Sequence, residues 1–372
     1  MGPTRYCRWI EKKLRHYVVA RVSYTQDILK QGKEFIMTSS LYQSFNTGTE
    51  YSGLALFTQR DGQKNLVDKI KQIVVGQDEA VEQLCSAMHE HYLRHQNGRT
   101  KGKNNVLLFG PAGTGKIFLC CTLARLLNIP FLCVDATQYT APGRVDGMID
   151  DILFKLSCEM VRLPNNTFPF SIVYIDEIDK VRLSQDGGAR DINGGIQKEL
   201  IKLFENSQHT SPSHRIYDIS KVWFVSGGEF AGLDEIIAKR LTKCEVSTPT
   251  ALSYSALLEQ ISMEDLMEYG FLPELLGRMA GRVVLNELDE NALVRILTEG
   301  KNNVISQYKA IFKQAGIRLI VPKEVLHTIA REAITNKMGV RGLAQVLSLW
   351  LKSKLLKTKK EHKKQYTLSV NP

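Results

Sequence analysis

The sequence has few cysteines and no long apolar run, and both shortages narrow the classes of protein that it can encode. Its 372 residues include seven scattered cysteines without a Cys-x-x-Cys pair, which argues against a disulfide-stapled domain and favours a reducing compartment. No stretch of about 18 uninterrupted apolar residues occurs, so the sequence predicts no membrane span. Only 11 prolines and 27 glycines are present, which excludes a collagen-like or low-complexity chain.

The positive charge is concentrated at the two ends of the chain. The net charge is +10, and residues 1–33 hold eight Lys or Arg against two acids, while residues 352–372 hold seven Lys against one Glu. The part between is nearly neutral, so the sequence does not predict nucleic-acid binding by the folded middle. The N-terminal segment is amphipathic and poor in acids; we expect a cytoplasmic protein, with the mitochondrial matrix or another organelle as the alternative.

Four short apolar runs in the middle of the chain alternate with helical patterns. Strands separated by crossover helices predict an α/β fold whose parallel sheet is covered by helices on both faces. The predicted strands are Asn105–Phe109, Phe131–Asp135, Ser171–Asp176 and Val222–Ser226, and the helices are Lys116–Leu127, Met148–Val161 and Ile196–Phe204.

Helical spacing alone continues from about Glu287, which predicts a second, smaller and mainly helical domain. A stretch rich in Ser, Thr, Gly and Gln precedes the first domain and is typical of a linker. We therefore expect four parts: a basic amphipathic N-terminal segment (1–37), a linker (38–64), a large nucleotide-binding domain (65–286) and a small domain with a basic C-terminal stretch (287–372).

A glycine-rich loop follows the first predicted strand and leads into a helix. It reads Gly110-Pro111-Ala112-Gly113-Thr114-Gly115-Lys116. Such a P-loop turns backbone N–H groups toward an anion, the helix N-terminus adds its positive dipole end, and the lysine reaches the outer phosphates. The loop therefore predicts a nucleoside triphosphate, ATP with Mg²⁺. Ile117 stands where the motif has a hydroxyl for Mg²⁺, so we expect phosphate binding to survive and turnover to be weakened.

Two acids end the third predicted strand. Asp176 is a candidate Mg²⁺ ligand, and Glu177 is a candidate to orient and deprotonate an attacking water. An apolar strand that ends in acids is common in itself. Together with the P-loop, the pair predicts an ATPase.

Seven segments in order resemble the ClpX family of AAA+ unfoldases, the ATPase partners of the ClpP peptidase. The resemblance runs from about Asn65 to the end of the chain. It implies a ring, a homo-hexamer or a ring with related AAA+ subunits, that hydrolyses ATP to unfold protein substrates. The segments are Ile73–Gln77, the P-loop, Val134–Thr137, Ile172–Lys180, Gly227–Leu233, Phe271–Arg278 and Gly339–Leu343.

The resemblance also implies roles for single residues around the nucleotide. Val74 and Val75 would line the adenine, Lys116 and Asp176 would hold the phosphates and the metal, and Glu177 would be the catalytic acid. ATP would lie between the large and small domains of one subunit and against the next subunit.

Three further residues receive a role from the resemblance alone. Arg278 would be the arginine finger given to a neighbouring subunit, and Arg341 the sensor arginine that reports the nucleotide state to the small domain. Ser226 falls where a first sensor is expected. From spacing alone, each arginine is more typical of a protein surface.

The sequence differs from the family at several functional positions besides Ile117. Arg144 replaces the aromatic residue of the first pore loop, and only Cys7 precedes Cys85, so this sequence does not predict the family's four-cysteine zinc domain. No Ile-Gly-Phe tripeptide occurs between Lys243 and Met263, so docking to ClpP is not predicted.

Three functions remain open at this point. The first is an ATP-dependent unfoldase of the ClpX type, and the second is a hydrolysis-impaired, nucleotide-binding regulatory or structural subunit of a ClpX-like ring. The third is a DNA-linked ATPase that uses the basic ends. The joint presence of Glu177, Arg278 and Arg341 favours the first, because a chain that does not hydrolyse ATP has no chemical need of them.

Overall fold

The computed structural model describes eleven ranges of the chain: 53–97, 104–140, 145–159, 168–183, 192–205, 207–210, 216–243, 253–299, 303–336, 338–360 and 365–368. The predicted N-terminal segment, Arg144 and the stretch 244–252 lie outside these ranges. Among the helices described, none combines the length and the apolar character needed to cross a bilayer.

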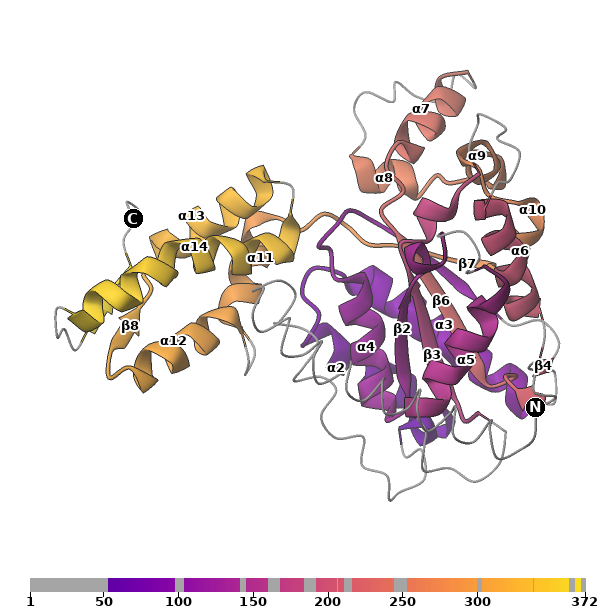
Figure 1. Cartoon of the computed structure of the whole chain (residues 1–372), viewed down its shortest axis with the longest axis horizontal. Coiled ribbons are helices and arrows are strands. Elements are labelled where there is room, and N and C mark those ends of the chain that lie inside the picture. The colour runs from indigo at the N-terminus through magenta and orange to yellow at the C-terminus, as the bar shows by residue number, and fades with distance from the viewer. Residues whose placement is uncertain are drawn as a thin grey trace.

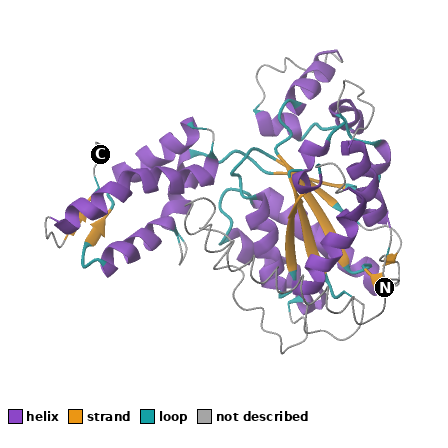
Figure 2. Ribbon diagram, in the orientation of Figure 1, coloured by secondary structure: helices purple, strands orange, loops and turns teal. Residues whose placement is uncertain are grey.

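A parallel sheet of five strands forms the centre of the larger part of the molecule (Figures 1 and 2), in the order β2-β3-β6-β1-β7. Four of the strands coincide with the predicted apolar runs, and the fifth, β7, was not predicted. The predicted α/β fold with a parallel sheet is confirmed. The strands are β1 (Val106–Phe109), β2 (Phe131–Asp135), β3 (Ser171–Asp176), β6 (Val222–Gly228) and β7 (Gly281–Val284).

Helices cover both faces of this sheet. Successive side chains of a strand point to opposite faces, so Leu107 and Phe109 of β1 join one buried cluster and Val106 and Leu108 join the other. The helices are α2 (Gly62–Lys71), α3 (Asp78–Gln96), α4 (Lys116–Leu127), α5 (Met148–Glu159), α6 (Ile192–Glu205), α7 (Leu233–Lys243), α8 (Tyr254–Leu258), α9 (Met263–Tyr269) and α10 (Pro273–Leu276).

Shorter elements complete the larger part. Leu54 and Phe57 of η1 are buried against the domain, although the sequence predicts a linker there. The many polar residues around these two apolar side chains hide their pattern in the sequence. The elements are η1 (Leu54–Thr58), η2 (Ala136–Tyr139), η3 (Val145–Gly147), η4 (Ile178–Val181) and the antiparallel pair β4 (Gln208–Thr210) and β5 (Ile216–Asp218).

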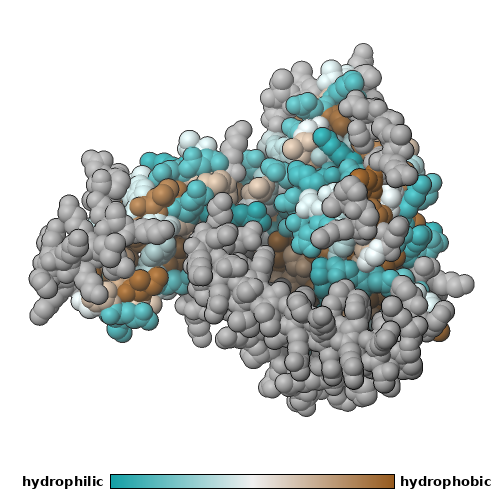
Figure 3. All heavy atoms as spheres, viewed as in Figure 1, coloured by the Kyte–Doolittle hydropathy of each residue, from teal (hydrophilic) through white to brown (hydrophobic). Residues whose placement is uncertain are grey.

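A smaller, mainly helical part follows β7 and has its own buried cluster. Side-chain caps begin two of its helices: Asp289 accepts the N–H of Ala292, and Asn303 that of Ser306. Hydrophilic residues cover much of the described surface, with apolar residues in small patches (Figure 3). The elements are α11 (Glu290–Thr298), α12 (Val304–Gln314), α13 (Lys323–Thr335), α14 (Gly339–Lys360) and the parallel pair β8 (Arg318–Ile320) and β9 (Gln365–Thr367).

Candidate nucleotide-binding site

The P-loop connects the end of β1 to the first residue of α4. Gly115, which precedes the helix, has a φ of 98°, and a Cβ at this position would meet no atom within 4 Å. Only glycine adopts this conformation without strain. The loop therefore leaves open space at the N-terminus of a 12-residue helix, where free N–H groups and the helix dipole favour an anion. This geometry fits a phosphate group.

Lys116 lies across the loop. Its Nζ donates hydrogen bonds to Gly110 O at 2.7 Å and to Pro111 O at 2.9 Å. Burial lowers the pKa of Lys116 to about 8, against the opposing effect of the Asp176 carboxylate. The ammonium group is still mainly protonated at pH 7, so it can pair with phosphate charge.

Asp176 and Glu177 lie at the C-terminal end of β3, beside Asp135 at the end of β2. Burial raises the pKa of Asp176, while the Glu177 N–H and the charge of Lys116 act against that rise. Burial followed by the charges of Asp135 and Asp176 raises the pKa of Glu177. The charges of Asp176 and Lys116 thus act on each other in the structure, and a phosphate and metal site shared by the two stays a prediction.

The donor set for Mg²⁺ is incomplete on the loop side. Ile117 is half-buried and packs against the apolar cluster between the sheet and α3. The hydroxyl of Thr114 donates to Pro111 O at 2.9 Å and is therefore engaged in the loop itself. Among the described residues, Asp176 is the candidate ligand, and an octahedral Mg²⁺ site would need further oxygens from phosphate and water.

The smaller part of the molecule reaches the P-loop through the first turn of α14. Val340 N donates to Gly113 O at 3.2 Å. The positive charge of Arg341, next in the chain, adds to the lowering of the Lys116 pKa by burial and opposes the rise of the Asp176 pKa that burial causes. The structure therefore brings this predicted sensor arginine to the phosphate site.

The predicted adenine-lining residues lie between the two parts of the molecule. Val74 is buried and Val75 is half-buried, in the connection that leads to α3. A Cβ on the next residue, Gly76, would meet the side chains of Leu288 and Ala292 at 3.0 and 3.5 Å. These contacts place the segment at the seam where the resemblance puts the base.

Arg278 lies away from the phosphate site of its own chain. Its carbonyl accepts a hydrogen bond from Asn105 Nδ2 at 2.9 Å, at the N-terminal end of β1, whereas the P-loop follows the C-terminal end. A four-residue strand spans roughly 13 Å. The guanidinium group pairs instead with Glu205 at 2.7 Å. Arg278 therefore lies outside the group formed by the P-loop, Asp176 and Arg341 in its own chain.

Gln77 contacts the P-loop, although no role for it is predicted from the sequence. It is buried, its Nε2 donates to Thr114 O at 3.3 Å and to Asn286 O at 2.8 Å, and its Oε1 accepts from Asn286 N at 2.9 Å. The only sequence signal is its place in the Ile73–Gln77 segment. Its partners lie 37 and 209 residues away, so no local pattern reveals the contact.

Ser226 is buried at the sheet centre, opposite Leu107 of β1 and Ile175 of β3. Its hydroxyl has no hydrogen-bond partner among the described residues. An unpartnered buried hydroxyl costs stability unless a ligand or water satisfies it. The position suits the sensor role that the resemblance implies, because Ser226 lies two residues before the last residue of β6.

Comparison with known proteins gives a consistent result. The family described as AAA domain (Cdc48 subfamily) matches residues 101–282. The chain is 33% identical over 311 residues to the "ATP-dependent Clp protease ATP-binding subunit ClpX" of Treponema denticola, which covers 76% of this chain and 74% of the relative. It is 34% identical to the protein of the same name from Bacteroides fragilis, over 83% of this chain and 79% of the relative.

Proposed function

Because the chain belongs to the ClpX family of AAA+ ATPases, we propose that it binds ATP in the P-loop and hydrolyses it to unfold or remodel protein substrates. The observation that carries the proposal is that Lys116 bonds to two carbonyl groups of the P-loop while the charges of Asp176 and Arg341 act on it. These three residues belong to segments that are distant in the sequence.

Each residue has a distinct task in the proposed reaction. The loop N–H groups and Lys116 bind the phosphates, and Asp176 holds the metal. When bound, ATP supplies the phosphoryl group and Mg²⁺ neutralises its charge. Glu177 accepts a proton from the attacking water, and burial with the nearby Asp135 and Asp176 charges raises its pKa, which makes it a stronger base than an ordinary glutamate.

A ring assembly is part of the proposal. Arg278 is at the opposite end of β1 from its own P-loop, so it can stabilise transferred charge only at the site of a neighbour. A head-to-tail arrangement gives every site one such arginine, and repetition of that contact closes a ring. We propose a homo-hexamer or a mixed ring with related AAA+ subunits.

One observation favours a second candidate, a nucleotide-binding subunit with impaired hydrolysis. Ile117 packs a half-buried, branched apolar side chain against the core and offers no hydroxyl to the metal. In a mixed ring, such a subunit would bind ATP and regulate competent neighbours. ClpP docking and nucleic-acid binding are not part of either proposal, because the sequence has no Ile-Gly-Phe tripeptide and its excess of positive charge is concentrated at the two ends.

Steady-state ATPase measurements on the purified chain test the proposal. We expect slow turnover, reduced at least about 100-fold by Glu177→Gln because the general base is lost. Ile117→Thr restores a metal-binding hydroxyl, so turnover should rise, whereas Ile117→Val has the same shape without the oxygen and should not raise it.

The outcomes separate the candidates. Tight ATP binding without turnover in both the wild type and Ile117→Thr would favour the regulatory subunit. No affinity for ATP or ADP, with no effect of Lys116→Ala, would contradict both functions.

A further inference from the structure

Two consecutive carbonyl groups of the P-loop accept hydrogen bonds from outside the loop. Gly113 O accepts from Val340 N of α14, and Thr114 O accepts from Gln77 Nε2. Gln77 also exchanges two hydrogen bonds with the backbone of Asn286, in the connection between β7 and α11. The P-loop is thereby joined both to the start of the smaller part and to its α14.

These carbonyls belong to peptide units that also face the phosphate site. The peptide bond is planar and trans, so the C=O of Gly113 is fixed opposite the N–H of Thr114, and the C=O of Thr114 opposite the N–H of Gly115. In a P-loop, such N–H groups bind the anion. A reorientation of either unit on phosphate binding therefore changes the hydrogen bond on its other side.

The contact between the P-loop and the first turn of α14 leaves little room for either to move independently. A Cβ on Gly113 would lie 2.4 Å from Met338 O, and one on Gly339 would lie 2.9 Å from Gly113 O. Two glycine backbones thus pack directly against each other. A change in the P-loop peptides displaces the first turn of α14.

We propose that Gln77 is a positioning residue that couples phosphate occupancy to the connection around Asn286, and so to the orientation of the smaller part. The inference rests on the proposed nucleotide binding. Gln77 suits this task because its buried amide bonds to three backbone groups at once, and a buried amide with satisfied donors and acceptors holds one orientation. This route runs beside Arg341 and does not require its charge.

Hydrogen–deuterium exchange of the full chain, with and without ADP and Mg²⁺, tests the coupling. In the wild type, we expect ADP to slow exchange in the P-loop and in peptides that cover residues 284–292. Gln77→Met keeps the side-chain length but makes no hydrogen bonds. In this variant the P-loop should still be protected, while the ADP-dependent slowing at 284–292 should fall at least tenfold.

Two further variants make the test specific. Gln77→Glu keeps the acceptor for Asn286 N but loses both donor bonds, so it should resemble Gln77→Met. Gln83→Met removes an exposed glutamine of α3 whose side chain, among the described residues, bonds to Glu79 of the same helix, and it should behave as wild type.

Three results would overturn the inference. The first is that ADP still slows exchange at 284–292 to the same extent in both Gln77 variants. The second is that the Gln77 variants exchange faster in all peptides while the effect of ADP is intact, which indicates a merely structural role. The third is loss of the ADP effect at 284–292 in Arg341→Met but not in Gln77→Met. By contrast, absence of P-loop protection in the wild type would contradict the proposed nucleotide binding itself.

Discussion

Glu177 has a backbone conformation that is rare outside glycine. Its φ of 54° and ψ of 37° lie in the left-handed region, at a cost of about 1–2 kcal/mol. The turn sends Ile178 into the core directly after β3 has ended at Asp176. The buried neighbours hold the strained residue in place, so the carboxyl group occupies a defined position beside the site.

The raised pKa of Glu177 predicts the pH dependence of turnover. Activity requires the ionised carboxylate, so it should fall as the pH drops through this pKa, at a higher pH than for an ordinary glutamate. Asp135→Asn removes the neighbouring charge that raises the pKa of Glu177 most and should move the acidic limb of the kcat profile to lower pH. Asp68→Asn, an exposed change on α2, should leave it in place. Identical limbs in both variants would contradict the electrostatic explanation.

The sequence predicts the residues that act on the nucleotide better than it predicts the residues that contact and position them. Lys116, Asp176 and Glu177 are readable because their motifs are local and follow predicted strands. The effect of Asp135 on Glu177 depends on the pairing of β2 with β3, and the Gln77 contacts join segments far apart in the chain. Such contacts arise from tertiary packing, which a local pattern does not encode.

At the scale of elements, burial decides what the sequence reveals. The four predicted strands are apolar runs covered on both faces, and β6 is buried throughout. Strand β7 has an exposed Arg282 and one buried residue, Val283, whereas β2, at the other edge of the sheet, has three buried residues. Its pattern therefore resembles a loop. Strands β8 and β9 are three residues each, too short to show a period.

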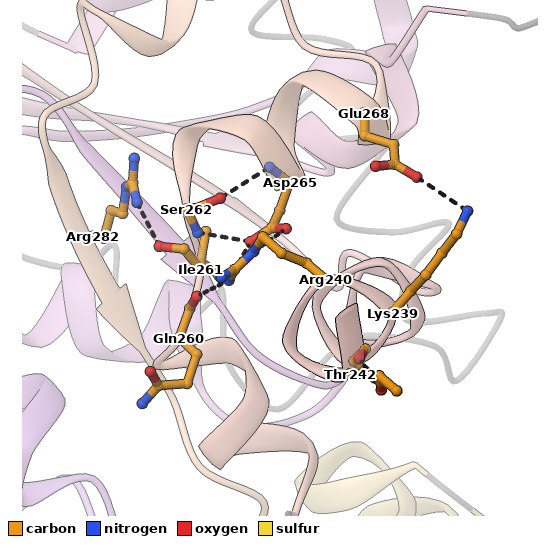
Figure 4. Close-up of polar contacts among 10 residues, drawn as sticks. Lys239, Arg240, Thr242, Gln260, Ile261, Ser262, Asp265, Glu268 and Arg282 are labelled. Carbon is orange, nitrogen blue, oxygen red and sulfur yellow. Dashed lines mark hydrogen bonds and ion pairs between the residues drawn. The ribbon is translucent and has the colours of Figure 1, made fainter. Parts of the chain in front are cut away.

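Helices α7 and α9 are joined by an ion pair with an unusual number of hydrogen bonds (Figure 4). Arg240 donates to both oxygens of the buried Asp265, at 2.8 and 2.9 Å, and to Gln260 O. Ser262 and Asp265 form a capping box at the start of α9. Burial opposes ionisation, yet Arg240 and Ser262 hold the pKa of Asp265 below its usual range.

This pair should contribute measurably to stability. Arg240→Met leaves the buried carboxylate without its partner, so the free energy of unfolding should fall by about 2 kcal/mol, less than for a fully buried pair because Arg240 is partly exposed. Lys239→Met removes the neighbouring exposed pair with Glu268, whose atoms are 3.9 Å apart, and should change it by less than about 0.5 kcal/mol. Denaturant unfolding measures both, and equal effects would contradict the assignment.

At the scale of the whole molecule, the position of Arg278 predicts complementation between defective subunits. Arg278→Ala chains keep Glu177, and Glu177→Gln chains keep Arg278, so a mixed ring contains some interfaces with both groups. Each variant alone should be inactive, and an equal mixture should recover up to roughly a quarter of wild-type ATPase activity if subunits assemble at random. No recovery from a mixture shown to co-assemble would contradict action across the interface.

The ion pair between Arg278 and Glu205 bears on the subunit before assembly. Both side chains are about half exposed, and an ion pair of this kind contributes at most about 1 kcal/mol. In a subunit that has not assembled, the Arg278 guanidinium is thus hydrated and paired with Glu205. Breaking this pair so that Arg278 can bind the triphosphate of a neighbouring subunit costs little free energy.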